Sequence, residues 1–304
     1  MLPGSAFLLA FLFTSAPSKP GRINLEIVDK SQSFLQFYAA ASKPGIDEAK
    51  RWALWQKMYH FAAVPPTPEG ERMARSMLDQ AWTRYAAALP VIRSGVAAIQ
   101  PPPKQSLDEV CQLLGVDVPI HIRLIAAVGD FDGNAYTFSD RDGVPTTAAE
   151  IEDPDTGMLL THEFTHAVEA EQAHLSLDWK RSIAHTIFVE GLAMRVVQHL
   201  HPGRKPEDYV GEFSPHWFMK SMGERKKILT DIYPHLSASD PDTVMRYTMG
   251  KSSLGIEREA YFAGWLVIGD LLNHGWTFPR LARVTDDQMV TLVGDSLQRM
   301  LKDN

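Results

Sequence analysis

Cysteine, positive charge and long apolar runs are all scarce in this sequence of 304 residues. A single cysteine, Cys111, excludes intrachain disulfides and a cysteine-based metal site. The 30 lysines and arginines are outnumbered by 37 aspartates and glutamates, and no basic patch predicts binding to nucleic acid. Beyond the N-terminus no stretch is long and apolar enough to cross a bilayer, so we expect no stable membrane span.

The N-terminal residues 1–16 have an apolar centre that is too short to span a bilayer as a helix. This pattern is typical of a secretory signal peptide, with cleavage expected near Ala16. No lysine or arginine precedes the apolar run, so a buried N-terminal segment of a cytoplasmic protein is the alternative. An exported chain without disulfides would suit a bacterial periplasm or the cell exterior.

Helical pattern dominates the residues that follow. With 45% hydrophobic residues, the chain can bury a full core, either as one large domain or as two closely packed lobes. We expect a helical N-terminal lobe over residues 17–104, with its strongest helices at 46–61 and 68–88. Thr67 is the expected N-cap of the second helix, and Pro68 suits its first position.

Residues 105–304 predict a second region that combines strands with helices. Apolar and polar residues alternate over 119–128, which indicates a half-buried strand, and a second strand is expected at 134–138. The remainder is largely helical. The expected fold class is therefore α+β and mostly α-helical, with a small antiparallel or mixed sheet.

The turn between the two predicted strands contains Asp130 and Asp132 followed by Gly133, a spacing that is reminiscent of a calcium loop. The loop pattern fails at two positions, because Ala135 occupies the place of the loop glycine and Arg141 that of the bidentate glutamate. We interpret the segment as an aspartate-glycine turn.

An H-E-x-x-H motif is formed by His162, Glu163 and His166 within a helical pattern. On a helix the two histidines share one face about 6 Å apart along the axis, so their imidazoles can bind one zinc ion. Glu163 then lies beside the open coordination position, where a general base can take a proton from water. Asp153 is the expected N-cap and Pro154 the first helical residue. The alternative is two histidines satisfied by ordinary hydrogen bonds.

A catalytic zinc site needs a third protein ligand. Glu169 lies about 10 Å along a straight helix from His162, too far to share the ion, and His174 is excluded for the same reason if the helix continues that far. Glu190 is the better candidate, because it stands in an apolar helical run where a lone carboxylate is costly to bury. The alternative partner of Glu190 is an arginine such as Arg181 or Arg195.

The motif and two later segments resemble known zinc peptidases. The run HEFTHAV at 162–168 is similar to the metal-binding helix of thermolysin-type gluzincin metallopeptidases. EGLA at 190–193 and AYFAGW at 260–265 look more like an uncharacterised bacterial family of predicted zinc-dependent proteases. The resemblance extends from about Ile120 to the C-terminus. It implies a zincin-like catalytic core within 105–304, with zinc held by His162, His166 and Glu190 and a peptide or protein as substrate.

Two positions depart from the thermolysin pattern. No asparagine precedes Glu190, and Met194 stands one turn later, where an aspartate would orient the first histidine. Glu169 and Asp178 are the candidates for that orienting role.

The second predicted strand also carries a resemblance. In gluzincins an edge strand just before the metal helix pairs with extended substrate, and Asn134-Ala135 is similar to the pair found there in the thermolysin group. A peptide that adds to such an edge gains main-chain hydrogen bonds with little demand on its sequence. An ordinary hairpin is the alternative.

Tyr261 is the candidate for stabilising an oxyanion. It shares a helix face with Gly264, Ile268 and Leu271, and its hydroxyl could donate a hydrogen bond to the tetrahedral intermediate. A core tyrosine is the alternative. Its rivals for the role are histidines: His185, His199, His201, His216, His235 and His274.

These inferences predict a zinc-dependent peptidase with Glu163 as the general base. Two other classes stay open, namely a non-catalytic zinc-binding scaffold or binding protein, and a metal-free helical protein in which the motif is accidental.

Overall fold

The computed structural model describes residues 22–62, 64, 67–133, 135–152, 155–178, 180–211 and 213–302. The predicted signal peptide at 1–16 therefore lies outside the described residues, as do Asn134, Asp153 and Pro154.

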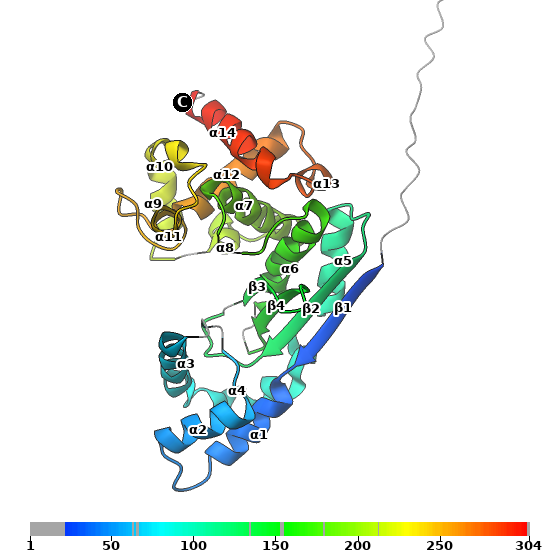
Figure 1. Ribbon diagram of the computed structural model, residues 1–304, viewed down its shortest axis with the longest axis vertical. Coiled ribbons are helices and arrows are strands. Elements are labelled where there is room, and N and C mark those ends of the chain that lie inside the picture. Colours follow the sequence, from blue (N-terminus) through cyan, green and yellow to red (C-terminus); the bar gives the residue numbers. More distant parts are fainter. Residues whose placement is uncertain are drawn as a thin grey trace, which may run out of the picture.

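A four-stranded mixed sheet lies in the middle of the molecule (Figure 1). Its strands are β1 (Ile23–Asp29), β2 (Ile120–Ala127), β3 (Ala135–Ser139) and β4 (Pro145–Glu150), in the order β1-β2-β4-β3. β2 pairs in parallel with both β1 and β4, whereas β3 pairs antiparallel with β4. The predicted α+β class and the small mixed sheet are confirmed.

One sheet face is buried by two helices. Along β2, Ile120, Ile122 and Leu124 are fully buried, as their alternation predicted. Helices α5 (Pro103–Leu113) and α6 (Thr156–Ala173) lie next to one another, and α6 also contacts β3 and β4. The sheet therefore positions α6, the helix that carries the histidine motif.

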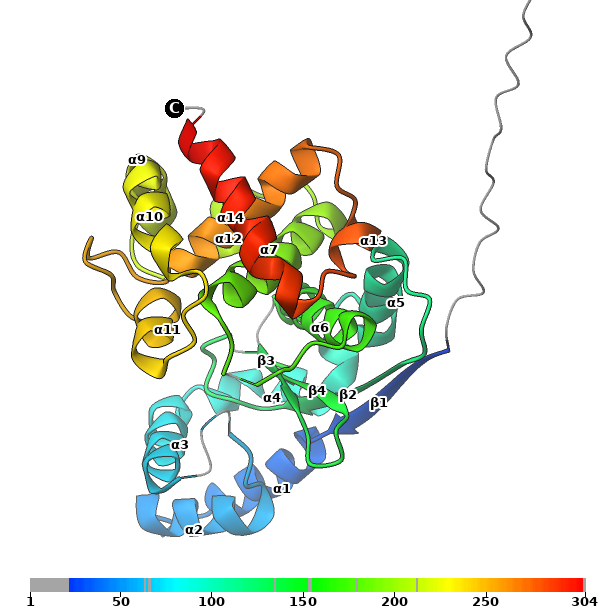
Figure 2. The ribbon, with the colours of Figure 1, turned by 45° about the horizontal axis from the view of Figure 1, so that its top comes forward.

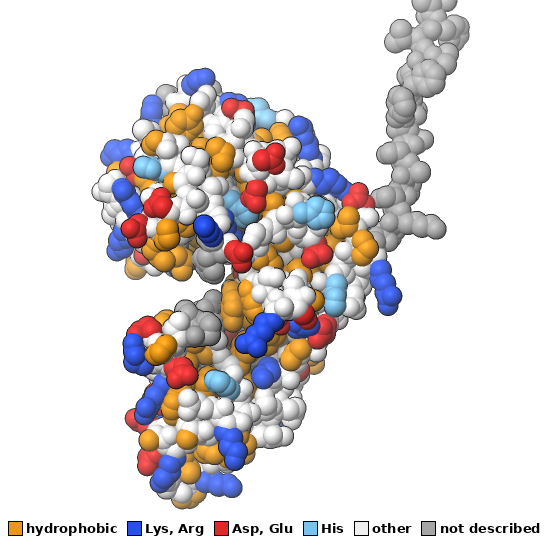
Figure 3. Space-filling view, in the orientation of Figure 1, with side chains coloured by type: hydrophobic (Ala, Val, Ile, Leu, Met, Phe, Trp, Pro, Cys, Tyr) orange, Lys and Arg blue, Asp and Glu red, His pale blue; other side chains and the backbone are white. Residues whose placement is uncertain are grey.

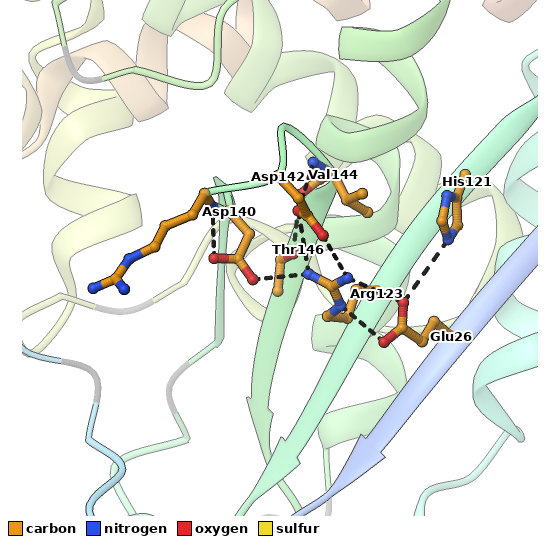
Figure 4. A network of polar contacts seen from close by, with 8 residues as sticks. Glu26, His121, Arg123, Asp140, Asp142, Val144 and Thr146 are labelled. Carbon is orange, nitrogen blue, oxygen red and sulfur yellow. Dashed lines mark hydrogen bonds and ion pairs between the residues drawn. The ribbon is translucent and has the colours of Figure 1, made fainter.

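Arg123 ties three strands together on the opposite face of β2 (Figure 4). Its guanidinium contacts Glu26 of β1 and both Asp140 and Asp142 of the β3–β4 turn, at 2.8 to 3.1 Å. Three carboxylates thus share one arginine, and the pKa of Arg123 is raised by hydrogen bonds to Asp142 and Glu26.

Helices of the N-terminal lobe gather at one end of the sheet in both ribbon views (Figures 1 and 2). They are α1 (Ser31–Ala41), α2 (Glu48–Met58), α3 (Pro68–Ala81), α4 (Tyr85–Ser94) and the 3₁₀ helix η1 (Gly95–Ala98). Thr67 caps α3 as predicted, since its hydroxyl accepts a hydrogen bond from the Gly70 N–H.

Two expectations for this lobe were wrong. The helix predicted over 68–88 is two helices, and the turn between them brings the Tyr85 ring 4.8 Å from that of Phe34 and its hydroxyl 2.7 Å from the Gly129 carbonyl. The lobe is also not wholly helical, because residues 23–29 form β1 and pair with β2. The sheet thus crosses the boundary predicted at residue 104, and one hydrophobic core contains residues from both sides of it.

The C-terminal half is helical and covers the other end of α6. Its helices are α7 (Ile183–Leu200), α8 (Pro206–Val210), α9 (Trp217–Gly223), α10 (Arg225–Ile232), η2 (Tyr233–His235), α11 (Pro241–Thr248), α12 (Glu259–Asn273), α13 (Phe278–Leu281) and α14 (Asp286–Lys302). Within the described part of the chain, no helix combines the length and apolarity that crossing a bilayer requires. The surface is hollowed between α8–α12 and the N-terminal helices, at the level of β3 (Figure 3).

Candidate metal centre

Helix α6 begins at Thr156, with Asp155 as its N-cap residue, and ends at Ala173. The Thr156 hydroxyl donates a 2.5 Å hydrogen bond to the Glu150 carbonyl, which fixes the start of the helix to the end of β4. The predicted start at Asp153 and Pro154 lies outside the described residues. His174 adopts a left-handed conformation as the C-cap, so it does not continue the helix.

Three side chains from α6 and α7 converge at one point. His162 Nε2 lies 3.1 Å from His166 Nε2, and Glu190 Oε2 lies 3.2 and 3.5 Å from these two nitrogens. The group can hold a metal ion. The predicted convergence of the two imidazoles with the Glu190 carboxylate is thus what the structure contains.

The separations fit a tetrahedral ion. Zinc binds histidine nitrogen and carboxylate oxygen at about 2.0–2.2 Å, which in a tetrahedron places the ligand atoms about 3.3–3.6 Å from each other. The three observed separations, from 3.1 to 3.5 Å, lie within or about 0.2 Å below this range. The side chains of His162 and His166 are 20% and 13% exposed, so solvent reaches the imidazoles.

Glu190 uses its two oxygens differently. Oε2 faces the imidazoles, whereas Oε1 lies 3.6 Å from the Arg181 guanidinium. The arginine that was considered as an alternative partner is therefore present together with the histidines and helps to orient the carboxylate. Arg195, the other arginine considered, donates instead to the Trp265 carbonyl at 2.7 and 3.0 Å.

The carboxylate and the imidazoles of the triad shift each other's pKa values. Burial alone would raise the pKa of Glu190, but the neighbouring His166 and His162 outweigh it and hold that pKa well below its ordinary value. Burial lowers the pKa of His162, yet the hydrogen bond to Glu190 and its charge, with that of Glu163, leave the net shift upward. The carboxylate is ionised and is ready to bind a cation.

Glu163 is almost fully buried and is anchored through its backbone to the sheet. Its carbonyl accepts a 3.1 Å hydrogen bond from the Thr137 hydroxyl of β3, and Thr137 also contacts Thr147 of β4. Sequence reasoning did not single out Thr137, although its place in the strand before the motif is a usable signal. The contact holds β3 beside the metal helix.

β3 is an edge strand of the described sheet and pairs through its other side with β4. The two strands form a hairpin, as the alternative interpretation expected, and substrate binding along the free edge stays a prediction. Ala135 is its first residue and pairs with Ala149, while the accompanying Asn134 lies outside the described residues.

Helices α7 and α12, which carry Glu190 and Tyr261, cross at two glycines. A Cβ added to Gly191 would overlap the Gly264 carbonyl, and one added to Gly264 would overlap the Ile187 carbonyl. The backbones therefore touch where only glycine fits. Tyr261 lies one turn before Gly264, and burial, followed by the charge of Glu190, raises its pKa. The phenol is therefore protonated.

The rival histidines have other surroundings. His185 contacts Asp286, His201 contacts the Thr161 hydroxyl, and His274 contacts Asp270. The rings of His199 and His235 pack against Phe278 and Tyr247, and His216 is exposed at the cap of α9.

The two candidates for orienting a histidine differ in burial. Asp178 is exposed, whereas Glu169 is fully buried and neither of its oxygens has a hydrogen-bond partner among the described residues. Burial, followed by the charge of Glu190, raises the pKa of Glu169, so this carboxyl is protonated.

No protein-family model matches this chain, and no curated protein matches it either. Its chemistry is therefore inferred from the residues and their geometry.

Proposed function

We propose that the protein is a zinc-dependent peptidase whose metal is held by His162, His166 and Glu190. The observation that carries the proposal is the set of three donor separations, 3.1 to 3.5 Å, in a cluster that solvent can reach. Two imidazoles with one carboxylate are typical of a catalytic zinc site with an open position. Bound there, zinc would supply the Lewis acidity that makes water acidic near neutral pH and polarises a carbonyl group.

Glu163 and Tyr261 have separate tasks in this proposal. The Glu163 carboxylate accepts a proton from the attacking water and then donates it to the nitrogen of the departing amine. The Tyr261 phenol, held protonated by its raised pKa, donates a hydrogen bond to the oxygen of the tetrahedral intermediate. One such donor contributes roughly 3 kcal/mol to the stability of a transition state.

The edge of β3 binds the substrate in this proposal. Thr137 fixes β3 to Glu163, so a peptide added along the free edge would pass the metal helix. Its main chain supplies most of the hydrogen bonds, which implies an extended segment of peptide or protein and a broad tolerance of sequence.

The decisive experiment measures zinc content and hydrolysis on the same preparations. The wild-type chain should hold about one zinc and cleave members of a peptide library, and Glu163→Gln should keep the zinc while losing cleavage by a factor of roughly 100 or more. Glu171→Gln, on the same helix but outside the cluster, is the matched control and should behave as wild type.

Each other outcome selects a different class. A wild-type chain that holds zinc but cleaves nothing in the library is a scaffold or binding protein. A wild-type chain without zinc refutes the metal centre. A fully active Glu163→Gln variant refutes the general base.

A further inference from the structure

A second group of potential ligands lies on the far side of the sheet from α6. Carboxylate oxygens of Asp130, Asp132 and Glu150 all come within 4.8 Å of each other. Asp130 and Asp132 belong to the turn after β2, and Glu150 ends β4. The parallel register pairs Glu150 with Ala127, which brings it to this turn although 20 residues separate it from Asp130.

The buried member of the cluster has an oxygen without a partner. Glu150 is 7% exposed, and among the described residues its Oε2 has no hydrogen-bond partner. The same is true of the buried Asp130 Oδ1. Leaving such atoms unsatisfied in the interior costs roughly 1–3 kcal/mol each, and more for charged groups. Two buried carboxylate oxygens without partners, in a group of three acids that each bring an oxygen within 4.8 Å of the others, indicate a missing positive partner.

The protein supplies little positive charge here. In the described part of the chain, neither Asp130 nor Glu150 forms an ion pair with a lysine or arginine. The nearby Arg84 donates to the Asp130 carbonyl at 3.2 Å and stacks on Phe131. A fourth acid, Glu152, adds negative charge while it accepts a hydrogen bond from the Gly129 N–H at 2.7 Å.

The raised pKa values of Glu150 and Glu152 agree with burial in a local excess of negative charge. Burial, followed by the charge of Glu152, raises the pKa of Glu150 to about 9. Burial also raises the pKa of Glu152 to about 7.

A small cavity adjoins the cluster. It measures about 40 Å³ and is lined by Gly129, Asp130 and Glu150, with the aromatic side chains of Trp55, Tyr85 and Tyr136 around them. A water needs about 10–15 Å³ by this measure, so the cavity has room for about three waters.

We propose that Asp130, Asp132 and Glu150 form a calcium site. All of the donors are oxygen, which favours hard cations over zinc. Three carboxylates offer up to six oxygens, and waters in the cavity can complete the six to eight that calcium prefers. The site arises from an irregular turn and a strand end, a geometry that suits the flexible shell of calcium better than the strict octahedron of magnesium.

The calcium site goes beyond the proposed peptidase function and does not depend on it. It is nevertheless connected to the metal helix, because the Glu150 carbonyl accepts the Thr156 hydroxyl at the start of α6. Calcium bound to the Glu150 carboxylate would therefore stabilise the segment from which His162 and His166 extend.

Terbium luminescence tests the site on the full chain. Tb³⁺ replaces calcium on oxygen ligands and emits when excited through nearby aromatic rings, which Trp55, Tyr85 and Tyr136 provide. Adding Tb³⁺ to the metal-depleted protein should produce this emission, and Ca²⁺ should remove it. Glu150→Gln should weaken calcium binding by about tenfold or more, since ligand charge sets the affinity of such sites. Asp295→Asn, an exposed acid on α14, is the matched control.

The outcomes are distinguishable from failure of the peptidase proposal. His162→Gln should keep the calcium-sensitive emission; if it loses the emission, the ion sits at the histidines and the calcium site is refuted. Emission that Mg²⁺ removes as readily as Ca²⁺, or that is unchanged in Glu150→Gln, also refutes it. If circular dichroism shows that Glu150→Gln is unfolded, the exposed Asp132→Asn decides, because it should weaken binding without affecting the fold.

Discussion

Two clusters, only 12 residues apart in the chain at Glu150 and His162, gather potential metal ligands in opposite ways. The histidine cluster combines two nitrogens with one carboxylate, and Arg181 neutralises the far oxygen of Glu190. The acid cluster consists of carboxylates whose buried oxygens have no partner in the described structure. In the histidine cluster, Glu190 has positively charged or chargeable partners even without metal. In the acid cluster, Asp130 and Glu150 form no ion pair with a lysine or arginine of the described residues. The difference predicts a tight site for zinc and a weaker one for calcium.

Loss of the Glu190 carboxylate should have the largest effect. In Glu190→Gln the third ligand is neutral, so zinc affinity should fall by more than the roughly 10–100-fold that loss of an outer-shell partner costs. Competition with a chromophoric chelator measures it, and Glu48→Gln, an exposed acid on α2, serves as control. Calcium-sensitive terbium emission should not change in Glu190→Gln. If both metals were lost together, the two clusters would not be independent.

Selective metal removal should separate the clusters by their contributions to stability. A ligand present at 1,000 times its Kd stabilises the folded state by about 4 kcal/mol, and one at 100 times its Kd by about 2.7 kcal/mol. 1,10-Phenanthroline, whose nitrogen donors take zinc and leave calcium, should therefore lower the Tm more than EGTA with zinc restored. Differential scanning calorimetry measures both shifts. An EGTA treatment that leaves the Tm unchanged would contradict the calcium site.

Gly129→Ala should damage the acid cluster without touching the histidines. A Cβ at this position would overlap the Glu150 carboxylate, so the turn or the glutamate must move. We expect a loss of about 1–3 kcal/mol in the free energy of unfolding, together with a weaker calcium response and unchanged zinc content. Urea titrations with and without calcium measure the change. Gly223→Ala, where an added Cβ meets no neighbouring atom within 4 Å, is the control and should not destabilise.

Arg123→Gln should have the smallest effect. It tests a third group of acids around Arg123, which already have a cationic partner. The three carboxylates around Arg123 are themselves 35–52% exposed and screened by solvent, so the loss of stability should be slight and should shrink further as salt is added. Thermal unfolding at low and high salt measures it. A calcium response that changed in this variant would show that the two groups of acids are coupled.

The histidine cluster could be predicted because its information is local. The four-residue spacing of His162 and His166 fixes their geometry on any helix, and Glu190 was identified by its apolar surroundings in the sequence. The acid cluster could not be predicted in this way. The sequence showed Asp130 and Asp132 as candidate ligands. A continuous calcium loop requires its bidentate glutamate at position 141, however, and this residue is Arg141. The register of β2 with β4 supplies Glu150 instead, and strand register is not a local property.

The sheet shows the same limit. β2 was predicted from its alternation, whereas β1 was missed, although Ile23, Leu25 and Ile27 alternate in the same way. β4 gives little signal, because its threonines and alanines are buried at every position without the branched apolar residues that mark most strands. The break between α3 and α4 follows from tertiary contacts of Tyr85 that the helical pattern does not reveal.

The crossing of α7 and α12 at Gly191 and Gly264 is a rigid contact between the two helices. Because main chain rests directly on main chain there, no side-chain rotamer change can make room for a larger residue at either glycine. Redesign of this protein should therefore leave Gly191 and Gly264 unchanged.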